Sequence, residues 1–173
     1  MSLDINTPRG QRTLADERAA VAIFESHYPQ CRYFHTPKAD AGDVDGIVCN
    51  LIEGRLVCVT ETKCRYDMTL EHFAEAYNRE WLVTFDKIIK GVKVAEALRI
   101  PFYGFLYIVQ NKALLHRRLW SPVAGFEFAS LMVRKTKTQA TCNGGSATRD
   151  NAFIDMTGTV PLYLCEGSND DQP

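Results

Sequence analysis

The sequence predicts an α/β (α+β) protein whose helices cover a mixed central sheet. Three observations support this class: an amphipathic helical segment precedes two apolar strands joined by a Glu-Gly turn, a second helical region ends at Pro101, and a strongly apolar strand follows that proline. With 46% hydrophobic and 24% charged residues in 173, the composition is that of an ordinary globular protein.

The first helix is expected to begin at Thr13, after a flexible N-terminus spanning residues 1–12. Thr13 followed by Asp16 matches a capping box, which commonly opens a helix. Glu17 lies at the edge of an apolar stripe on this helix, and the electrostatic preference for acidic residues in a first turn is an alternative explanation for it. The residues that share this helical face are Glu17, Ala20, Val21, Phe24 and Tyr28.

The strands near the middle of the chain are predicted from apolar runs and turn residues. Residues 31–36 suggest a short strand, and residues 44–52 and 55–63 suggest a hairpin closed by Glu53 and Gly54. Both alternating faces of residues 55–63 are largely apolar, which indicates a central strand covered on both sides.

The second half of the chain is expected to continue the fold with a helical region and more β structure. Residues 69–99 read as helical, with an interruption between residues 78 and 91, and apolar strands follow on either side of residue 111. We expect one domain over residues 13–165, with its core at about 13–110, a C-terminal β extension at 111–165 and a disordered tail at 166–173.

Composition narrows the classes of function. The formal net charge is −1, so the whole chain carries no basic signature for nucleic acid. No apolar run reaches the roughly 20 residues of a membrane span, and the polar N-terminus does not resemble a signal peptide, so a cytoplasmic protein is expected. The six cysteines form no CxxC pair, which favours reduced, buried thiols over disulfides or a zinc site.

A charged constellation interrupts the apolar hairpin. Asp43 and Asp45 stand at one end, and Glu61 and Lys63 share a face of the other strand. A two-residue turn would place Asp45 opposite Thr62, on the wrong side. A three-residue turn at residues 52–54, with Gly54 left-handed, would place Asp45 opposite Glu61. A functional interpretation therefore requires this second register.

Two converging carboxylates with a neighbouring ammonium suggest metal-assisted hydrolysis. Close carboxylates repel one another unless a hard divalent cation such as Mg²⁺ or Mn²⁺ neutralises them. Lys63 would then orient or deprotonate the attacking water, and the metal would stabilise charge that develops on a phosphodiester. The alternative is that these residues are solvated strand ends that form an ordinary salt bridge.

This pattern resembles the PD-(D/E)XK nuclease superfamily, in its resolvase-like and repair-nuclease branches. The similarity rests on "GDVDGIV", on "VCVTETK" and on the helix that carries Glu17, and it covers residues 13–110. It implies a restriction-endonuclease-like αβββαβ core in which Asp45, Glu61 and Glu17 bind Mg²⁺ or Mn²⁺. In such a core, Lys63 positions or activates the attacking water. Val44 stands where the family name has proline, and Asp43 is a rival to Asp45 as the ligand.

These residues and the resemblance together predict a metal-dependent deoxyribonuclease, expected to be an endonuclease. Arg65 and Tyr66 follow the signature and are candidate DNA contacts, as are Lys87 and Lys90, which form a basic helical stripe with Lys93. DNA is the expected partner, and the resemblance makes a homodimer plausible. The alternatives are a protein of the same fold that binds DNA without cutting it and an α+β interaction protein unrelated to nucleases.

Overall fold

The chain folds around a mixed sheet between two helices. The structure is a computed structural model that describes residues 7–37, 42–126, 132–137 and 148–165. Within these residues the helices and strands follow in the order α1 (Pro8–His27), β1 (Cys31–His35), β2 (Gly46–Asn50), β3 (Arg55–Arg65), α2 (Leu70–Tyr77), β4 (Glu80–Thr84), α3 (Phe85–Leu98), β5 (Phe102–Ile108), β6 (Ala113–Ser121), β7 (Gly125–Phe126), β8 (Met132–Lys137) and β9 (Thr148–Asp155).

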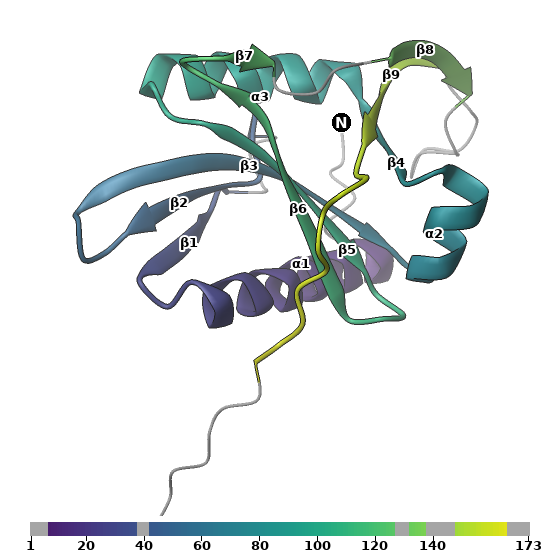
Figure 1. The fold of residues 1–173 in the computed structure, drawn as a ribbon, viewed down its shortest axis with the longest axis horizontal. Helices are drawn as coiled ribbons and strands as arrows, with labels where there is room; N and C mark the ends of the chain where they lie inside the picture. Colours follow the sequence, from purple (N-terminus) through teal and green to yellow (C-terminus); the bar gives the residue numbers. More distant parts are fainter. Residues whose placement is uncertain (1–6, 38–41, 127–131, 138–147, 166–173) are drawn as a thin grey trace, which may run out of the picture.

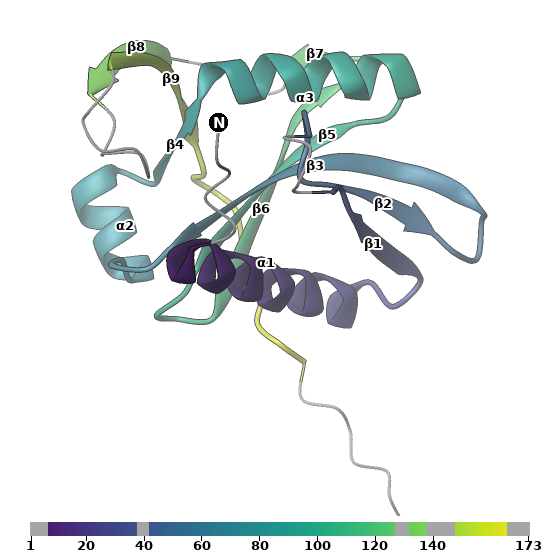
Figure 2. The same ribbon diagram turned by 180° about the vertical axis from the view of Figure 1, so that it is seen from behind.

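The central sheet has the strand order β1-β2-β3-β5-β6-β7. Strand β3 runs parallel to β5, and the other neighbouring pairs are antiparallel. Helix α1 lies against one face of this sheet and α3 against the other (Figure 1 and, from behind, Figure 2). The predicted mixed α/β class is therefore confirmed.

A second, smaller sheet joins segments that are distant in sequence. Strand β9 pairs with β4 on one side and with β8 on the other. Strand β6 belongs to the central sheet, and Leu115, Leu119 and Ile154 are buried in the same core cluster as Phe102. The β structure expected after residue 110 is thus present, and it completes the core of the fold instead of extending it.

The N-cap of helix α1 lies six residues before the cap predicted at Thr13. Thr7 is the N-cap, its hydroxyl oxygen accepts a hydrogen bond from Gly10 N at 3.1 Å, and Pro8 occupies the first turn. Threonine at the cap followed by proline is a strong start signal, because proline lacks the backbone N–H that a first turn leaves unpaired. The capping box predicted at Thr13 is therefore wrong. Residues 8–12, predicted to belong to a flexible N-terminus, are helical. Residues 1–6, predicted to be flexible, and residues 166–173, predicted to be disordered, lie outside the described residues.

The predicted interruption of the helical region at 69–99 is a β-strand. Helix α2 ends at Asn78, which, like Arg79, has a positive φ, and β4 follows directly. In β4 the side chains of Trp81 and Val83 are buried, which is the two-residue period of a strand. Pairing with β9 overrides the helical preference of the surrounding sequence.

Helix α1 buries the face that the sequence predicted. Ala20, Val21 and Phe24 are buried against the sheet, in one cluster with Phe105 and Tyr107. Among the described residues, none of the helices combines the length and the apolar character that a membrane crossing requires. The described cysteines are free thiols: Cys31, Cys49, Cys58, Cys64 and Cys165. The sixth, at position 142, lies outside the described residues.

Candidate functional site

The β2–β3 hairpin adopts the register on which the candidate site depends. Asn50 pairs with Arg55, which leaves a four-residue loop at 51–54, one residue longer than predicted. This loop alone would place Asp45 opposite Thr60. Val57 is an extra residue in β3, because Cys49 pairs with Leu56 and Val48 with Cys58. The bulge shifts the register by one residue, so that Gly46 pairs with Thr60 and the next position aligns Asp45 with Glu61.

The loop itself is built by two of its residues. The side-chain oxygen of Asn50 accepts hydrogen bonds from the N–H groups of Ile52 and Glu53, each at 3.0 Å. Gly54 has φ +62°, the left-handed conformation that the sequence analysis predicted for it. The required register thus arises from a longer loop and a strand bulge that compensate each other.

Asp45 is held in place by hydrogen bonds to the two residues that flank Glu61 in β3. Its backbone N–H donates to the Thr60 carbonyl at 2.9 Å, and its Oδ2 accepts from the Thr62 N–H at 2.8 Å. The side chain of Asp45 is buried, with 8% of the residue exposed. The next residue must be glycine, because a Cβ on Gly46 would lie 2.2 Å from the Tyr33 ring. This close packing fixes the position of the Asp45 backbone.

Glu61 is a buried carboxyl beside a second carboxyl. Only 6% of the residue is exposed, and its Oε2 accepts no hydrogen bond. Burial raises the pKa of Glu61 to about 8, and Asp45 adds to this rise through its charge and a side-chain hydrogen bond. Lys87 and Lys63 act in the opposite direction. The pair therefore binds a proton more readily than two separate carboxylates would.

Two lysines approach this carboxyl pair from different elements. Lys87, in the first turn of α3, places its Nζ 3.5 Å from Glu61 Oε2. Lys63 lies two residues beyond Glu61 on β3 and is exposed to solvent at its surface. Loss of hydration from the surrounding protein still lowers the pKa of Lys63, and nearby Arg65 contributes to this fall, although Glu61 and Asp45 oppose it.

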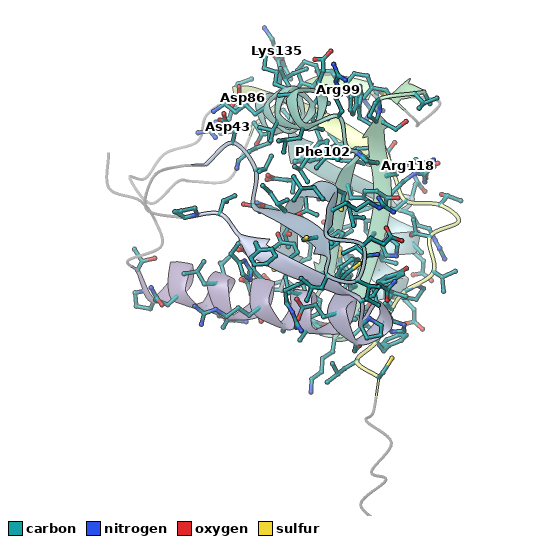
Figure 3. The ribbon with its side chains drawn as sticks, turned by 90° about the vertical axis from the view of Figure 1, so that its left-hand side faces the viewer. Asp43, Asp86, Arg99, Phe102, Arg118 and Lys135 are labelled. Carbon is teal, nitrogen blue, oxygen red and sulfur yellow. The ribbon has the colours of Figure 1, made fainter. Side chains whose placement is uncertain are left out.

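Asp43 belongs to a different set of contacts. It is exposed and forms an ion pair with Lys90 at 3.4 Å, and Lys90 also pairs with Asp86 at 3.5 Å. Figure 3 shows Asp43 and Asp86 close together beside one end of α3. The geometry therefore favours Asp45 over Asp43 as the partner of Glu61, and it places Lys90 in a surface ion-pair network.

Glu17 is buried on α1, with 8% of the residue exposed. Its negative charge helps to raise the pKa of the Cys64 thiol to about 12, although burial is the larger cause. Within the described ranges, no group of three or more His, Cys, Asp or Glu side chains is placed to hold a metal ion. Asp45 and Glu61 therefore form a carboxylate pair, and Glu17 is not gathered with them into one ligand set.

The residues that follow Lys63 have structural contacts. Arg65 donates to the Leu82 carbonyl at 3.1 Å and so connects β3 to β4. The Tyr66 hydroxyl donates to Thr13 Oγ1 at 3.0 Å, and the guanidinium of Arg12 lies 4.6 Å from the Tyr66 ring centre. Both residues join elements of the fold, a role that the sequence did not indicate for these two candidate DNA contacts.

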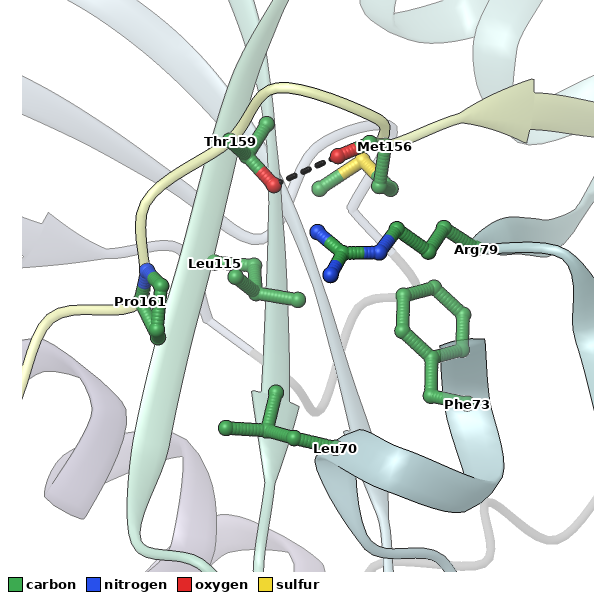
Figure 4. A pocket seen from close by; sticks show the side chains of 7 residues that line it. All are labelled: Leu70, Phe73, Arg79, Leu115, Met156, Thr159 and Pro161. Atoms are coloured by element: carbon green, nitrogen blue, oxygen red, sulfur yellow. Dashed lines mark hydrogen bonds between the residues drawn. The ribbon is translucent and has the colours of Figure 1, made fainter. Parts of the chain in front are cut away.

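Two hollows in the structure lie apart from the carboxyl pair. A cavity of about 80 Å³ is lined mainly by apolar side chains from α2, β6 and residues 156–161, with Arg79 among them (Figure 4). An open groove of about 620 Å³ is lined partly by Tyr28, Tyr103 and Arg117, and Arg117 donates to the carbonyls of Asp155 and Thr157. None of the described residues that line either hollow carries a carboxylate.

Among the described residues, the buried carboxyl pair of Asp45 and Glu61 is therefore the group best suited to bind a metal ion or to take part in catalysis. Carboxylate oxygens suit Mg²⁺ or Mn²⁺, which are commonly held by one or two carboxylates together with waters and substrate phosphate. The position of Lys87 at Glu61 was missed by the sequence analysis, which placed this lysine on a DNA-facing stripe. The spacing of the lysines in α3 gives no signal for this contact, because it depends on the packing of α3 on β3.

Comparison of the chain with protein-family models, with curated proteins and with solved structures finds no match.

Proposed function

We propose that the chain is a metal-dependent deoxyribonuclease that hydrolyses phosphodiester bonds, with a catalytic site formed by Asp45, Glu61 and Lys63. The observation that carries the proposal is the buried Glu61 carboxyl, which is aligned with Asp45 and has an oxygen without a hydrogen bond. A buried carboxylate costs free energy unless a cation or hydrogen bonds compensate it. A site for a divalent cation accounts for this cost.

The residues present fit a hard divalent cation. Glu61 Oε2 is a buried oxygen with a free lone pair, and the Asp45 carboxylate adjoins it. The pair offers oxygen ligands only, which is the donor set that Mg²⁺ and Mn²⁺ prefer. A bound ion would supply Lewis acidity toward the scissile phosphate. Asp45 and Glu61 would hold it, with Asp45 itself fixed by the Thr62 N–H.

Lys63 is the residue that would act on water. It lies on the same strand as Glu61, two residues further along, so both side chains project from the same face of β3. Its lowered pKa increases the fraction of neutral amine that can accept a proton from the attacking water at neutral pH. Its protonated form would then stabilise the negative charge that grows on the phosphate oxygens.

The arrangement of elements supports the resemblance to PD-(D/E)XK nucleases. A helix, three antiparallel strands, a helix and a strand parallel to the third follow one another as α1, β1, β2, β3, α3 and β5. This is the αβββαβ order that the resemblance implies, with α2 and β4 inserted before α3. The fold alone does not specify an activity, so the proposal depends on the carboxyl pair and Lys63.

The test is cleavage of labelled linear, circular, single-stranded and branched DNA with Mg²⁺ or Mn²⁺. We expect metal-dependent cutting by the wild type and a loss of at least about 100-fold in Lys63→Ala and Glu61→Ala, the usual contribution of a positioned acid or base. Glu71→Ala, which removes an exposed charge from α2, is the control and is expected to cut like the wild type. A folded wild type that binds metal and DNA but cuts no substrate would instead support the non-cleaving DNA-binding alternative.

A further inference from the structure

Lys87 is the cation that meets Glu61 in the structure. Its Nζ lies 3.5 Å from Glu61 Oε2, the same buried oxygen that accepts no hydrogen bond. The contact is therefore ionic and lacks the geometry of a hydrogen-bonded pair. The Lys87 side chain is 35% exposed, whereas that of Glu61 is 8% exposed. Lys87 thus reaches the buried carboxyl from a more exposed position than that of Glu61 itself.

The position of Lys87 differs from that of the other lysines nearby. Lys63 comes from β3 itself and interacts with both carboxyls of the pair. Lys90 lies about one turn further along α3 and pairs with the exposed Asp43 and Asp86. Among these three, Lys87 is the one whose ammonium forms an ion pair with a buried carboxyl oxygen.

We propose that Lys87 is a built-in counter-ion at Glu61, which a divalent metal ion must displace when it binds. This inference rests on the proposed function, because it assumes that Glu61 is a metal ligand. Two cations within about 4 Å of one oxygen repel strongly in a partly buried site, so the ammonium and the metal compete for it. The lysine keeps the metal-free site electrically balanced and lowers the apparent affinity for metal.

The displaced ammonium has a second role on DNA. Lys87 starts at the solvent edge of the carboxyl pair, and its flexible side chain leaves the charged end within reach of a phosphate bound there. A lysine contacts phosphate as a point charge and contributes to binding by counter-ion release. Removal of Lys87 should therefore change metal binding and DNA cleavage in opposite directions.

The experiment measures Mn²⁺ affinity by calorimetry without DNA, and then single-turnover cleavage at saturating Mn²⁺. We expect Lys87→Gln to bind Mn²⁺ at least about fivefold more tightly than the wild type, because a unit charge near the ion is removed. We also expect it to cleave at least about tenfold more slowly. Lys87→Arg retains a competing cation and should bind Mn²⁺ like the wild type. Lys90→Gln removes the same charge one turn away and should change the Mn²⁺ affinity no more than about twofold.

Each outcome bears on the inference separately from the nuclease assignment. If the wild type cuts DNA and Lys87→Gln binds Mn²⁺ no more tightly, the inference is wrong and the nuclease stands. If Lys87→Gln binds Mn²⁺ more tightly but no variant cuts, the competition is supported and the nuclease assignment fails. If neither protein binds Mn²⁺, both are overturned. A similar gain in Lys90→Gln would show a general charge effect and would overturn the direct competition.

Discussion

Glu61 is the residue at which stability and the proposed function conflict most clearly. Burial and the neighbouring Asp45 raise the pKa of its carboxyl to about 8, above the value it has in an unfolded chain. The folded protein therefore binds this proton more tightly than the unfolded chain does. By linkage, the free energy of unfolding falls as pH rises from the unfolded pKa through the folded one. Without metal, the buried carboxylate destabilises the protein at alkaline pH.

A neutral, isosteric residue at this position should remove that loss. We expect the gain in stability of Glu61→Gln over the wild type to be small at pH 5, where the folded Glu61 carboxyl is protonated, and to reach about 1–3 kcal/mol at pH 9. The measurement is the free energy of unfolding in denaturant at both pH values, with a chelator present. Glu71→Gln, at an exposed position of α2, is the control and should show no such pH-dependent gain. A gain of the same size at pH 5 would contradict this account of Glu61.

The sequence was informative about the residues of β2 and β3 and much less about their neighbours. Alternation along a strand is enough to place Glu61 and Lys63 on one face, and the hairpin restricts Asp45 to a few registers. Lys87 was singled out only as part of a stripe with Lys90 and Lys93. Its contact with Glu61 depends on how α3 packs on the sheet, which no local pattern encodes.

Among the elements, the β2–β3 hairpin aligns Asp45 with Glu61, but its loop and its strand bulge differ from the turn expected from the sequence. Glu53 and Gly54 mark the turn, and Gly54 is left-handed as expected. The loop is longer than predicted, and the bulge at Val57 restores the alignment. Leu56, Val57 and Cys58 are all apolar, so the sequence gives no indication of which residue is extra. The register that the functional interpretation required is present, but it forms by a longer loop and a strand bulge that the sequence did not indicate.

The left-handed turn allows a direct test of this hairpin. A Cβ added to Gly54 would meet no atom within 4 Å, so Gly54→Ala adds backbone strain without a steric clash. We expect it to lower the free energy of unfolding by about 1 kcal/mol. Gly54→Asn should cost less, because asparagine tolerates the left-handed region better. Denaturant unfolding measures both, and an alanine variant as stable as the wild type would contradict the left-handed turn.

The helical region at 69–99 shows a different limit of local sequence. Its interruption was predicted between residues 78 and 91, but it was not recognised as a strand. Trp81 and Val83 alternate with more exposed neighbours over only five residues, too few for the period to be distinguished from that of a helix. The partner β9 lies about 70 residues further along, so the pairing that stabilises β4 is invisible to any local pattern.

For the whole molecule, the candidate site exists only when several elements assemble. Asp45 precedes β2, Glu61 and Lys63 come from β3, and Lys87 comes from α3. Strand β5 supports β3 along its length, from Val59 to Arg65. The mixed α/β class followed from the order of apolar runs, whereas the three-dimensional site depends on packing between segments up to about 40 residues apart.

The most direct test of the central claim is the number of Mn²⁺ ions bound per chain, counted by electron paramagnetic resonance. We expect one ion for the wild type and for Asp43→Asn, because Asp43 lies in the surface network with Lys90. Asp45→Asn and Glu61→Gln should lose it, since each variant replaces one of the two proposed carboxylate ligands with an amide. Retention of the ion by folded Asp45→Asn and Glu61→Gln, or its absence from the wild type, would contradict the proposed site.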